Sequence, residues 1–291
     1  MSFELFNDFF QDPAKQFLND SIALALAEDG EDLTSKAIFR DGHTAKAEIV
    51  AKQDTLVAGL PIIPLVLDRV EPGAGKGAAF LCPEGAKVQA GTTVAELVCR
   101  TTTVLKSERV MLNYICRLSG IANLTQTYVQ ALAGSKTVLL DTRKTAPGLR
   151  YPEKYAVLTG GGRNHRKNLA EMLMVKDNHV DGAGSIERAV TMLRQAYDLC
   201  PPIEVECRTL GEVKEAVNLN VDRIMLDNMD LAALENALEL IPKHTESEVS
   251  GGIGLSDIAG IARLGPDFIS VGKITHQAGA ADFSMRMAKK S

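Results

Sequence analysis

The feature that most constrains the fold is a regular alternation of strand-like and helix-like segments, which begins after Gly134. The β-rich runs are residues 137–140, 172–175, 203–205, 223–226, 246–249 and 268–271, and the later helical stretches are residues 185–199, 210–219, 231–240 and 256–263. This alternation is typical of βαβ units, which build a parallel sheet. Six such strands wound right-handedly form either a barrel or a doubly wound sheet.

The chain before about residue 116 lacks this rhythm and predicts a separate module. The expected helices are residues 3–18, 19–28 and 61–70, and the expected strands are residues 45–50, 55–58 and 93–98. Together they predict an α+β module with an antiparallel sheet. From Lys106 the apolar spacing predicts an amphipathic helix that breaks near Gly120, followed by a second helix that runs to about Ala133.

Length and charge narrow the class of protein. The 291 residues suit one or two domains. An apolar fraction of 45% is enough for a hydrophobic core. The net charge is −5, aromatic residues make up 5% and tryptophan is absent. Because a basic surface interleaved with aromatic residues is missing, we expect no nucleic-acid partner.

Neither a membrane segment nor a disulfide framework is predicted. The longest apolar run, residues 55–67, is interrupted by Pro61 and Pro64 and is shorter than the roughly 20 residues of a membrane helix. The amino terminus has neither the basic region nor the small-residue cleavage site of a signal peptide. The five cysteines are scattered and show no C-x-x-C spacing. We therefore expect a soluble, cytoplasmic protein with reduced thiols and no structural zinc.

Polar or glycine residues follow each of the six predicted strands. They are Asp141, Thr142, Arg143, Lys144, Lys176, Asp177, Asn178, Glu206, Asp227, Asn228, Ser250, Gly251, Gly252, Gly272 and Lys273. The carboxyl ends of the strands of a parallel barrel open on one face, so these residues are expected to converge on one pocket. At a single strand they would equally suit the start of a solvated loop. Their recurrence at six strands favours a shared functional site.

Basic residues form the first candidate group in this pocket. They are Arg143, Lys144, His165, Arg166 and Lys176. Arginine can hold a carboxylate through two hydrogen bonds, and lysine supplies a point charge. Several cations around one cavity predict a polyanionic substrate that carries carboxylates or phosphates. The alternative is that these cations form ion pairs with Asp141, Glu153 and Glu171. A Schiff base on one of the two lysines is a further alternative.

Two acidic residues, Glu206 and Asp227, end neighbouring predicted strands, so their carboxylates are expected at one pocket mouth. Carboxylates that face phosphates often do so through Mg²⁺, which takes one or two protein carboxylates plus substrate oxygens. We therefore expect Mg²⁺ at Glu206 and Asp227. Glu204 shares a strand face with Glu206, because only Val205 separates them, and a structural role is the alternative for one of these two glutamates.

Two glycine turns follow the last two predicted strands. They are Ser250-Gly251-Gly252-Ile253 and Ser270-Val271-Gly272-Lys273. Glycine lets backbone amides approach an anion, and a helix that follows directs its positive end there. Paired turns at the last two strands of a barrel commonly bind phosphate. The alternative is that both glycine pairs serve only as turns.

With these residues the chain resembles the quinolinate phosphoribosyltransferase family, the decarboxylating enzymes of NAD biosynthesis. The resemblance extends over nearly the whole chain. Its most specific part is the D-T-R-K-T-x-P-G-L-R run of residues 141–150 with the downstream His165-Arg166. Where relatives usually show H-R-x-G-L, this chain has Lys167-Asn168-Leu169 after His165-Arg166. Asparagine tolerates left-handed backbone, so the turn is expected to persist.

The resemblance implies an α/β fold of two domains and a defined assembly. Residues 1–116, joined by residues 275–291 at the end of the chain, would form an N-terminal α/β (α+β) sandwich. Residues 117–274 would form an incomplete six-stranded parallel α/β barrel that carries the site. The resemblance also implies a homodimer, in which Arg109 completes the site of the neighbouring subunit.

The resemblance further implies a reaction, in which phosphoribosyl passes from 5-phosphoribosyl 1-pyrophosphate (PRPP) to quinolinate with decarboxylation to nicotinate mononucleotide. The residues that would hold quinolinate are Arg109, Arg143, His165, Arg166 and Lys176. The other substrate-binding residues would be Thr142, Lys144, Glu206, Asp227 and the two glycine turns, Ser250, Gly251, Gly252, Val271, Gly272 and Lys273. Lys144, Glu206 and Asp227 would be catalytic, the two acids meeting Mg²⁺ through the pyrophosphate.

Two alternatives of different kinds stay open. One is a related barrel with another anionic acceptor, such as a molybdenum-transport relative or a nicotinate enzyme. Lys176 and the segment around Arg109 favour quinolinate, because its second carboxylate needs them. The other is a non-catalytic anion-binding module. The pair Glu206 and Asp227 argues against it, because a binder of anions would not need two carboxylates.

Overall fold

The computed structural model describes residues 3–39 and 42–287, and it divides into two compact units. Unit 1 comprises residues 1–126, 145–161 and 274–291, and unit 2 comprises residues 127–144 and 162–273. Unit 1 thus holds residues 117–126 and 145–161, which the expected division placed in the barrel domain. Residues 288–291 of the expected C-terminal segment lie outside the described residues.

The segment 145–161 belongs to unit 1 because its helix is packed there. The ring of Tyr155 is fully buried and lies 5.4 Å from the ring centroids of both Phe6 and Phe10. Glu153 accepts hydrogen bonds from the guanidinium of Arg117 at 2.9 and 3.1 Å. Aromatic packing therefore holds this helix against the N-terminal segment, and the ion pair of Glu153 with Arg117 ties it to the helix of residues 101–131.

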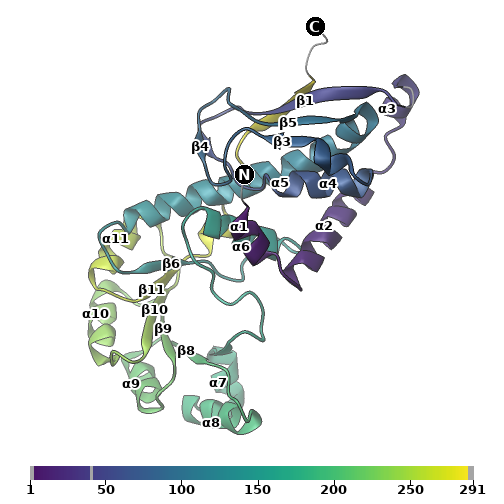
Figure 1. Ribbon diagram of the computed structural model, residues 1–291. Helices are drawn as coiled ribbons and strands as arrows, with labels where there is room; N and C mark the ends of the chain where they lie inside the picture. The colour runs from purple at the N-terminus through teal and green to yellow at the C-terminus, as the bar shows by residue number, and fades with distance from the viewer. Residues whose placement is uncertain (1–2, 40–41, 288–291) are drawn as a thin grey trace. The chain divides into compact units, whose positions relative to one another are not determined.

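Unit 1 consists of helices around two small sheets (Figure 1). Its helices are α1 (Glu4–Phe9), α2 (Ala14–Glu28), α3 (Leu33–Ile38), α4 (Ile62–Val70), η1 (Ala74–Gly77), α6 (Arg150–Thr159) and α12 (Lys273–His276), and α5 (Thr101–Ala131) leads from unit 1 into unit 2. Its strands are β1 (Thr44–Ala51), β2 (Thr55–Leu56), β3 (Ala78–Phe80), β4 (Lys87–Val88), β5 (Thr93–Arg100) and β12 (Phe283–Met287).

The larger sheet of unit 1 is antiparallel, with the strand order β12-β1-β5-β3. β12 pairs with β1, so the end of the described chain returns to the first sheet. In Figure 1, α4 and α5 lie along one side of this sheet. Ile49, Leu97 and Val66 are fully buried and form part of the core of the unit. The expected antiparallel sheet with helices against it is confirmed.

The predicted break of the long helix near Gly120 is wrong, because α5 runs without interruption from Thr101 to Ala131. A Cβ atom on Gly120 would lie 1.9 Å from the carbonyl oxygen of Gly279. Glycine is therefore present so that the chain near Gly279 can approach the helix, and it does not end the helix.

Unit 2 is built on six parallel strands, which confirms the predicted architecture. They are β6 (Val138–Leu140), β7 (Leu173–Val175), β8 (Ile203–Cys207), β9 (Arg223–Asp227), β10 (Glu246–Ser250) and β11 (Phe268–Ser270). Its helices are α7 (Asp177–Ala183), α8 (Ile186–Ala196), α9 (Leu210–Asn218), α10 (Leu231–Leu240) and α11 (Leu255–Arg263). The strand order is β6-β11-β10-β9-β8-β7, so the sheet is open between β6 and β7 and the barrel is incomplete.

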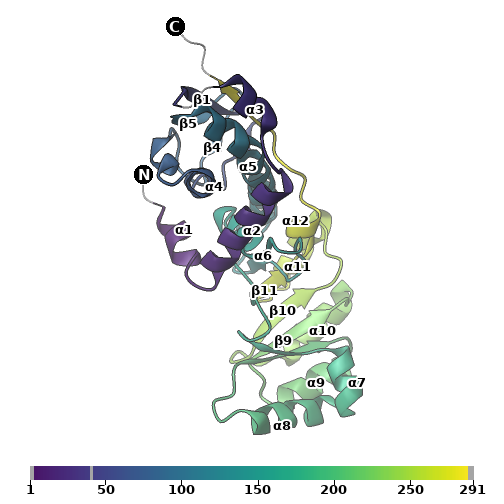
Figure 2. The same cartoon turned by 90° about the vertical axis from the view of Figure 1, so that its right-hand side faces the viewer.

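The two faces of this sheet differ in chemistry because side chains alternate along each strand. Val205, Leu226 and Val249 are buried on one face, which α9, α10 and α11 cover (Figures 1 and 2). The opposite face carries charged and polar side chains, among them Glu204 and Arg223, which are register partners. Parallel strands are usually apolar on both faces, so a polar inner face indicates a site.

All five cysteines are free thiols, as predicted. Among the described residues, no helix combines the length and the apolar character needed to cross a membrane.

Candidate functional site

A cavity of about 510 Å³ lies at the carboxyl ends of the strands of unit 2. The predicted site residues that line it are Thr142, Arg143, Lys144, His165, Arg166, Lys176, Glu206, Asp227, Ser250, Gly251 and Gly252. Its volume is within the range of roughly 300 to 1,000 Å³ that is usual for small-molecule sites. The structure therefore brings most of the predicted residues into one pocket.

Four predicted residues do not line this cavity. Arg109 is exposed on α5 within unit 1. Val271, Gly272 and Lys273 follow β11, where Ser270 lines the cavity in their place. Val271 is buried, and the ammonium of Lys273 donates to the carbonyl of Gly252 at 2.9 Å. This hydrogen bond links Lys273 to the first glycine turn.

Two arginines of the cavity lack a carboxylate partner. In the described part of the chain, no acid lies within ion-pair distance of Arg143 or Arg166, and the buried Nε of Arg143 has no hydrogen-bond partner. Arg166 instead donates from Nη1 to the carbonyl of Met172 at 2.9 Å. Burial lowers the pKa of Arg166, and the like charge of Arg143 lowers it further. This arrangement favours the binding of an anion.

The three acids that were considered as counter-charges have other partners. Asp141 accepts hydrogen bonds from the backbone N–H of His165 at 2.9 Å and from Asn164. Glu153 pairs with Arg117, and Glu171 pairs with Lys167 at 3.6 Å. Ion pairing with these acids is therefore wrong as an explanation for the two cavity arginines.

Glu206 and Asp227 come from neighbouring strands and share one face. Glu206 is the register partner of Met225, and Asp227 lies two residues further along β9. Lys176, at the start of α7, donates from Nζ to Oε2 of Glu206. Asp227 accepts a hydrogen bond from the side chain of Asn228 at 2.7 Å. Glu206 is thus neutralised by a lysine, whereas in the described part of the chain the side-chain partner of Asp227 is an amide.

The first glycine turn has a backbone that requires glycine. The φ angles of Gly251 and Gly252 are +108° and +59°, in the left-handed region. A Cβ atom on Gly251 would lie 2.4 Å from Oδ1 of Asn228. The backbone N–H of Asn228 donates to the carbonyl of Ser250 at 3.0 Å. The turn is therefore fixed against the end of β9, and its backbone lines the cavity.

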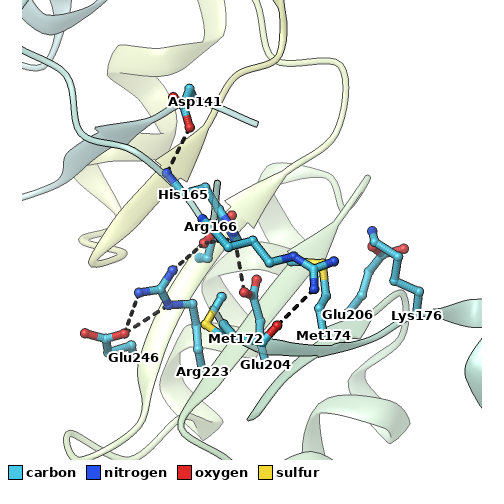
Figure 3. Close-up of polar contacts among 11 residues, drawn as sticks. Asp141, His165, Arg166, Met172, Met174, Lys176, Glu204, Glu206, Arg223 and Glu246 are labelled. Carbon is cyan, nitrogen blue, oxygen red and sulfur yellow. Dashed lines mark hydrogen bonds and ion pairs between the residues drawn. The ribbon is translucent and has the colours of Figure 1, made fainter. Parts of the chain in front are cut away.

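A group of four side chains, His165, Glu204, Arg223 and Glu248, reaches from the inner face of the sheet to the cavity, and we call it the His165 cluster. Figure 3 labels three of its members, His165, Glu204 and Arg223. Nε2 of His165 lies 3.1 Å from Oε2 of Glu204 and 3.4 Å from Oε2 of Glu248. Arg223 donates from Nη1 to Glu248 at 3.1 Å, and its other nitrogens reach Glu246. Both cluster glutamates have no exposed surface.

Burial and mutual contacts shift the titration of this cluster. Burial opposes a charge on His165, but Glu204 and Glu248 outweigh it and raise the pKa of His165 to about 9. Burial, together with the charge of Glu248, raises the pKa of Glu204. Burial would also raise the pKa of Glu248, but contacts with His165 and Arg223 reverse this and lower it. The pKa of Glu204 is therefore raised while the pKa of Glu248 is lowered, although the two groups lie close together.

Two sets of side chains could hold a metal ion. Glu206 and Asp227 offer carboxylate oxygens at the cavity. The ligand atoms of His165, Glu204 and Glu248 lie within 4.8 Å of one another, which is close enough for one ion. Mg²⁺ prefers oxygen ligands, whereas a histidine with carboxylates suits zinc or iron.

Some cavity residues were not predicted from the sequence. They are Met174, Met225 and Glu248, whereas Asn228 and Ser270, which also line it, belong to the strand ends at which a pocket was expected. Glu246 and Glu248 alternate in β10 as Glu204 and Glu206 do in β8. This spacing in the sequence could have indicated that Glu248 faces the cavity. The two methionines give the inner face an apolar part, against which a flat ring can lie.

A second cavity, of about 440 Å³, lies within unit 1 between α2, α5 and α6. Phe17 and Leu24 line it and are largely exposed. Arg117 also lines this cavity, and its guanidinium donates hydrogen bonds to Glu153 and to the carbonyls of Thr275 and Ala278. Because its strongest charges are paired, this cavity is a weaker candidate for binding an anion.

Comparison with known proteins adds independent findings. Two family models match adjoining parts of the chain. One, described as the quinolinate phosphoribosyl transferase N-terminal domain, matches residues 32–119, and the other, the C-terminal domain of that enzyme, matches residues 121–286.

Curated relatives match most of the chain. It is 41% identical to a probable nicotinate-nucleotide pyrophosphorylase (carboxylating) of Synechocystis, over 85% of this chain and 84% of that protein. It is 38% identical to the chloroplastic nicotinate-nucleotide pyrophosphorylase (carboxylating) of Arabidopsis thaliana, over 91% of this chain and 81% of that protein.

Solved structures share the fold over nearly the whole chain. NadC from Streptococcus pyogenes is 37% identical, with a TM-score of 0.86 over 93% of this chain and 96% of that chain. The nicotinate-nucleotide pyrophosphorylase from Francisella tularensis is 33% identical, with a TM-score of 0.88 over 96% of this chain and 99% of that chain.

Proposed function

Because the chain belongs to the quinolinate phosphoribosyltransferase family, we propose that the cavity of unit 2 is where it transfers phosphoribosyl from PRPP to quinolinate. The products are nicotinate mononucleotide, CO₂ and pyrophosphate, in the biosynthesis of NAD. One observation carries this assignment of the cavity. It is the pair Arg143 and Arg166, which face a common pocket without a carboxylate partner, since quinolinate brings two carboxylates.

The acceptor would be held by the basic side of the cavity. Arg143 and Arg166 would each bind a carboxylate, and Lys176 would add a third positive charge. Met174 and Met225 also line the cavity and would offer apolar contact to the pyridine ring. Nicotinate has one carboxylate, so it would leave one of these cations without a partner.

The donor would be held by the other side of the cavity. Ser250, Gly251 and Gly252 offer backbone to the 5′-phosphate, and Lys144 offers a positive charge to the pyrophosphate. The hydroxyl of Thr142 accepts the N–H of Lys144 at 3.0 Å, which fixes the loop that carries this lysine. Asp227 would face the ribose.

Mg²⁺ fits the acidic pair of this site. Glu206 and Asp227 supply carboxylate oxygens, and this ion is commonly held by one or two carboxylates together with substrate phosphates. Since Lys176 already contacts Glu206, Asp227 would be the stronger ligand and Glu206 the weaker one. When bound, the ion would neutralise negative charge on the pyrophosphate.

The charges of the site match the charges that develop in the reaction. As the bond between C1 of the ribose and pyrophosphate breaks, the ribose becomes positive, and Asp227 would stabilise that charge. Lys144 would stabilise the departing pyrophosphate while the ring nitrogen of quinolinate attacks C1. The nitrogen then carries a positive charge, so it stabilises the electron pair left at C2 when CO₂ departs. A proton taken up at C2 completes nicotinate mononucleotide.

The assembly and location are part of the same proposal. Arg109 is exposed on α5, so a second copy of the chain can receive it in its own cavity, and the active unit would be a homodimer. The five free thiols support a reducing compartment, the cytoplasm.

Calorimetric titration of quinolinate and nicotinate tests the assignment of the cavity. We expect quinolinate to bind at least about tenfold more tightly than nicotinate, because of its second carboxylate. Arg143→Ala should remove most of that difference, whereas Arg263→Ala, an exposed arginine of α11 in the same unit, should leave it unchanged. Equal affinities for the two acids would instead favour a nicotinate enzyme.

A further inference from the structure

Asn228 lines the cavity, but the proposed reaction gives it no part. It directly follows Asp227, the last residue of β9. Its φ angle of +55° is in the left-handed region, which asparagine tolerates better than most residues and glycine adopts most easily. Because glycine would suit this backbone at least as well, the contacts of the side chain are what asparagine adds at this position.

The side-chain amide of Asn228 lies between Asp227 and the first glycine turn. Its Nδ2 donates to Oδ2 of Asp227 at 2.7 Å. A carboxylate accepts hydrogen bonds and cannot donate them, so the nitrogen of the amide faces Asp227 and the oxygen faces away from it. On that other side is Gly251, where an added Cβ atom would come within 2.4 Å of Oδ1 of Asn228.

The backbone of Asn228 is fixed to the same turn. Its N–H donates to the carbonyl of Ser250 at 3.0 Å, and Ser250 is the register partner of Asp227 in the neighbouring strand. A Cβ atom on Gly251 would also lie 2.6 Å from the backbone nitrogen of Asn228. Glycine at position 251 therefore leaves the room in which Asn228 lies beside Asp227.

The hydrogen bond from the amide fixes the orientation of the Asp227 carboxylate. A carboxylate rotates easily about its bond to the side chain unless a contact holds it. With Oδ2 held by Asn228, the direction of Oδ1 is fixed as well. The amide is uncharged, so it orients Asp227 without neutralising it, in contrast to Lys176, which contacts Glu206 with a positive charge. A group that is already oriented stabilises a developing charge at a lower cost of reorganisation.

We propose that Asn228 is a positioning residue, whose amide holds the Asp227 carboxylate toward the donor and joins it to the turn of Ser250, Gly251 and Gly252. The groups that are proposed to meet the ribose and the 5′-phosphate are then held together by one side chain. Asn228 acts through Asp227 and not on the reacting atoms. This proposal rests on the proposed function only for the identity of the donor.

Glycine at position 228 separates positioning from a role in the turn alone. Asn228→Gly suits the left-handed backbone and removes the amide, so it should lower kcat about three- to tenfold and leave the KM for quinolinate within about twofold. Asn228→Asp keeps the size of the side chain but places a second carboxylate beside Asp227, so its kcat should fall at least as far. An unchanged kcat in Asn228→Gly would overturn the proposal.

Asn220 offers a matched control for the backbone. Among the described residues it is the other non-glycine residue with a positive φ angle, +49°. It precedes β9, whereas Asn228 follows that strand, so it lies at the end away from the cavity. Asn220→Gly should leave kcat and both KM values within about twofold. Equal losses of kcat in Asn220→Gly and Asn228→Gly would show that the backbone, and not the amide, causes the effect.

A double variant tests whether Asn228 acts through Asp227. In Asp227→Ala the amide has lost its acceptor, so the addition of Asn228→Gly should lower kcat by less than about a further twofold. Residues that act independently would instead give losses that multiply. Multiplied losses of kcat in the folded double variant would show that Asn228 acts by another route, and the positioning role would be wrong.

NMR of ¹⁵N-asparagine-labelled protein tests the hydrogen bond without any turnover. The side-chain signals of Asn228 are those lost in Asn228→Gly. We expect one of its two amide protons to be shifted downfield by the carboxylate, and this shift should disappear in Asp227→Ala. Amide signals of Asn228 that do not respond to Asp227→Ala would overturn the proposal. If the unmodified chain did not use PRPP, the proposed function would fail, and the NMR result would still stand.

Discussion

Asp227 is the residue whose charge the proposed chemistry needs most, because no lysine or arginine in the described residues pairs with it. Asp227→Ala should lower kcat at least about tenfold, which corresponds to about 1.4 kcal/mol of barrier. It should raise the KM for PRPP and leave the affinity for quinolinate unchanged. Asp227→Asn, which keeps the shape, should lose nearly as much. A collapse of quinolinate affinity with normal use of PRPP would place Asp227 on the acceptor side.

Glu84 in unit 1 predicts how stability depends on pH. It accepts hydrogen bonds from the backbone N–H groups of Gly59 and Leu60 and from the hydroxyl of Tyr155. Burial outweighs these bonds and raises the pKa of Glu84 to about 7. Because the folded protein holds this proton more tightly than the unfolded chain, stability should be lost as the pH rises from about 4.5 to about 7.

Urea unfolding at several pH values checks this prediction with Glu84→Gln as the comparison. The loss that Glu84 causes is on the order of 3 kcal/mol at most, and it should be missing from the variant, which cannot ionise. The variant should also be less stable at low pH, since its amide offers a donor where two N–H groups need an acceptor. If the free energy of unfolding changed with pH in the same way in both proteins, the raised pKa of Glu84 would be contradicted.

The inner face of the barrel shows what single residues reveal in the sequence and what they do not. The spacing of Glu204 and Glu206 correctly placed both on one face. Which of them is buried depends on His165 and Glu248, which come from other segments of the chain. Arg143 was predictable because it lies three residues after the end of β6, whereas Glu248 was missed because it lies within a strand.

Among the elements, α5 offers the clearest test, which is whether close packing against Gly279 requires a glycine at position 120. Gly120→Ala places a methyl group 1.9 Å from the carbonyl oxygen of Gly279, so we expect a loss of stability of about 2 kcal/mol or more. Gly260→Ala in α11 is the matched control, since its methyl group would meet nothing closer than 3.8 Å. It should stabilise the protein by up to about 1 kcal/mol. Equal effects in thermal unfolding would show that Gly120 is not closely packed.

The elements of unit 2 were predicted to within a few residues, because each strand and helix repeats the same pattern, with the exception of α7, which was not predicted. The prediction was poorer in unit 1. Residues 3–18 contain two helices, since Pro13 separates α1 from α2, and α3 was not predicted at all. Gly120 was misread because a glycine that ends a helix and one that admits a neighbouring chain look alike in the sequence. The partner of Gly120 lies at Gly279, far along the chain.

At the scale of the whole molecule, the proposal requires two chains for each active site. Arg109→Ala and Lys176→Ala should each be nearly inactive while folded and dimeric. A heterodimer of the two has one site with both defects and one with neither. Mixing the variants should therefore restore up to about a quarter of normal activity after subunit exchange.

Size-exclusion chromatography and a tagged copy verify the exchange in this experiment. Lys136→Ala, an exposed lysine of unit 2 that does not line the cavity, is the control and should retain full activity. No recovery after verified exchange, or full activity in a monomer, would show that Arg109 does not act in the site of a partner chain.

The most direct test of the central claim uses quinolinate labelled in the carboxylate next to the ring nitrogen. With PRPP and Mg²⁺, the chain should release labelled CO₂ and pyrophosphate in equal amounts, together with nicotinate mononucleotide. Arg143→Ala should release far less of all three products. Without PRPP no CO₂ should appear, because only the quaternary nitrogen stabilises the electron pair left at C2. CO₂ release without PRPP, or pyrophosphate release with nicotinate at the same rate, would contradict the account.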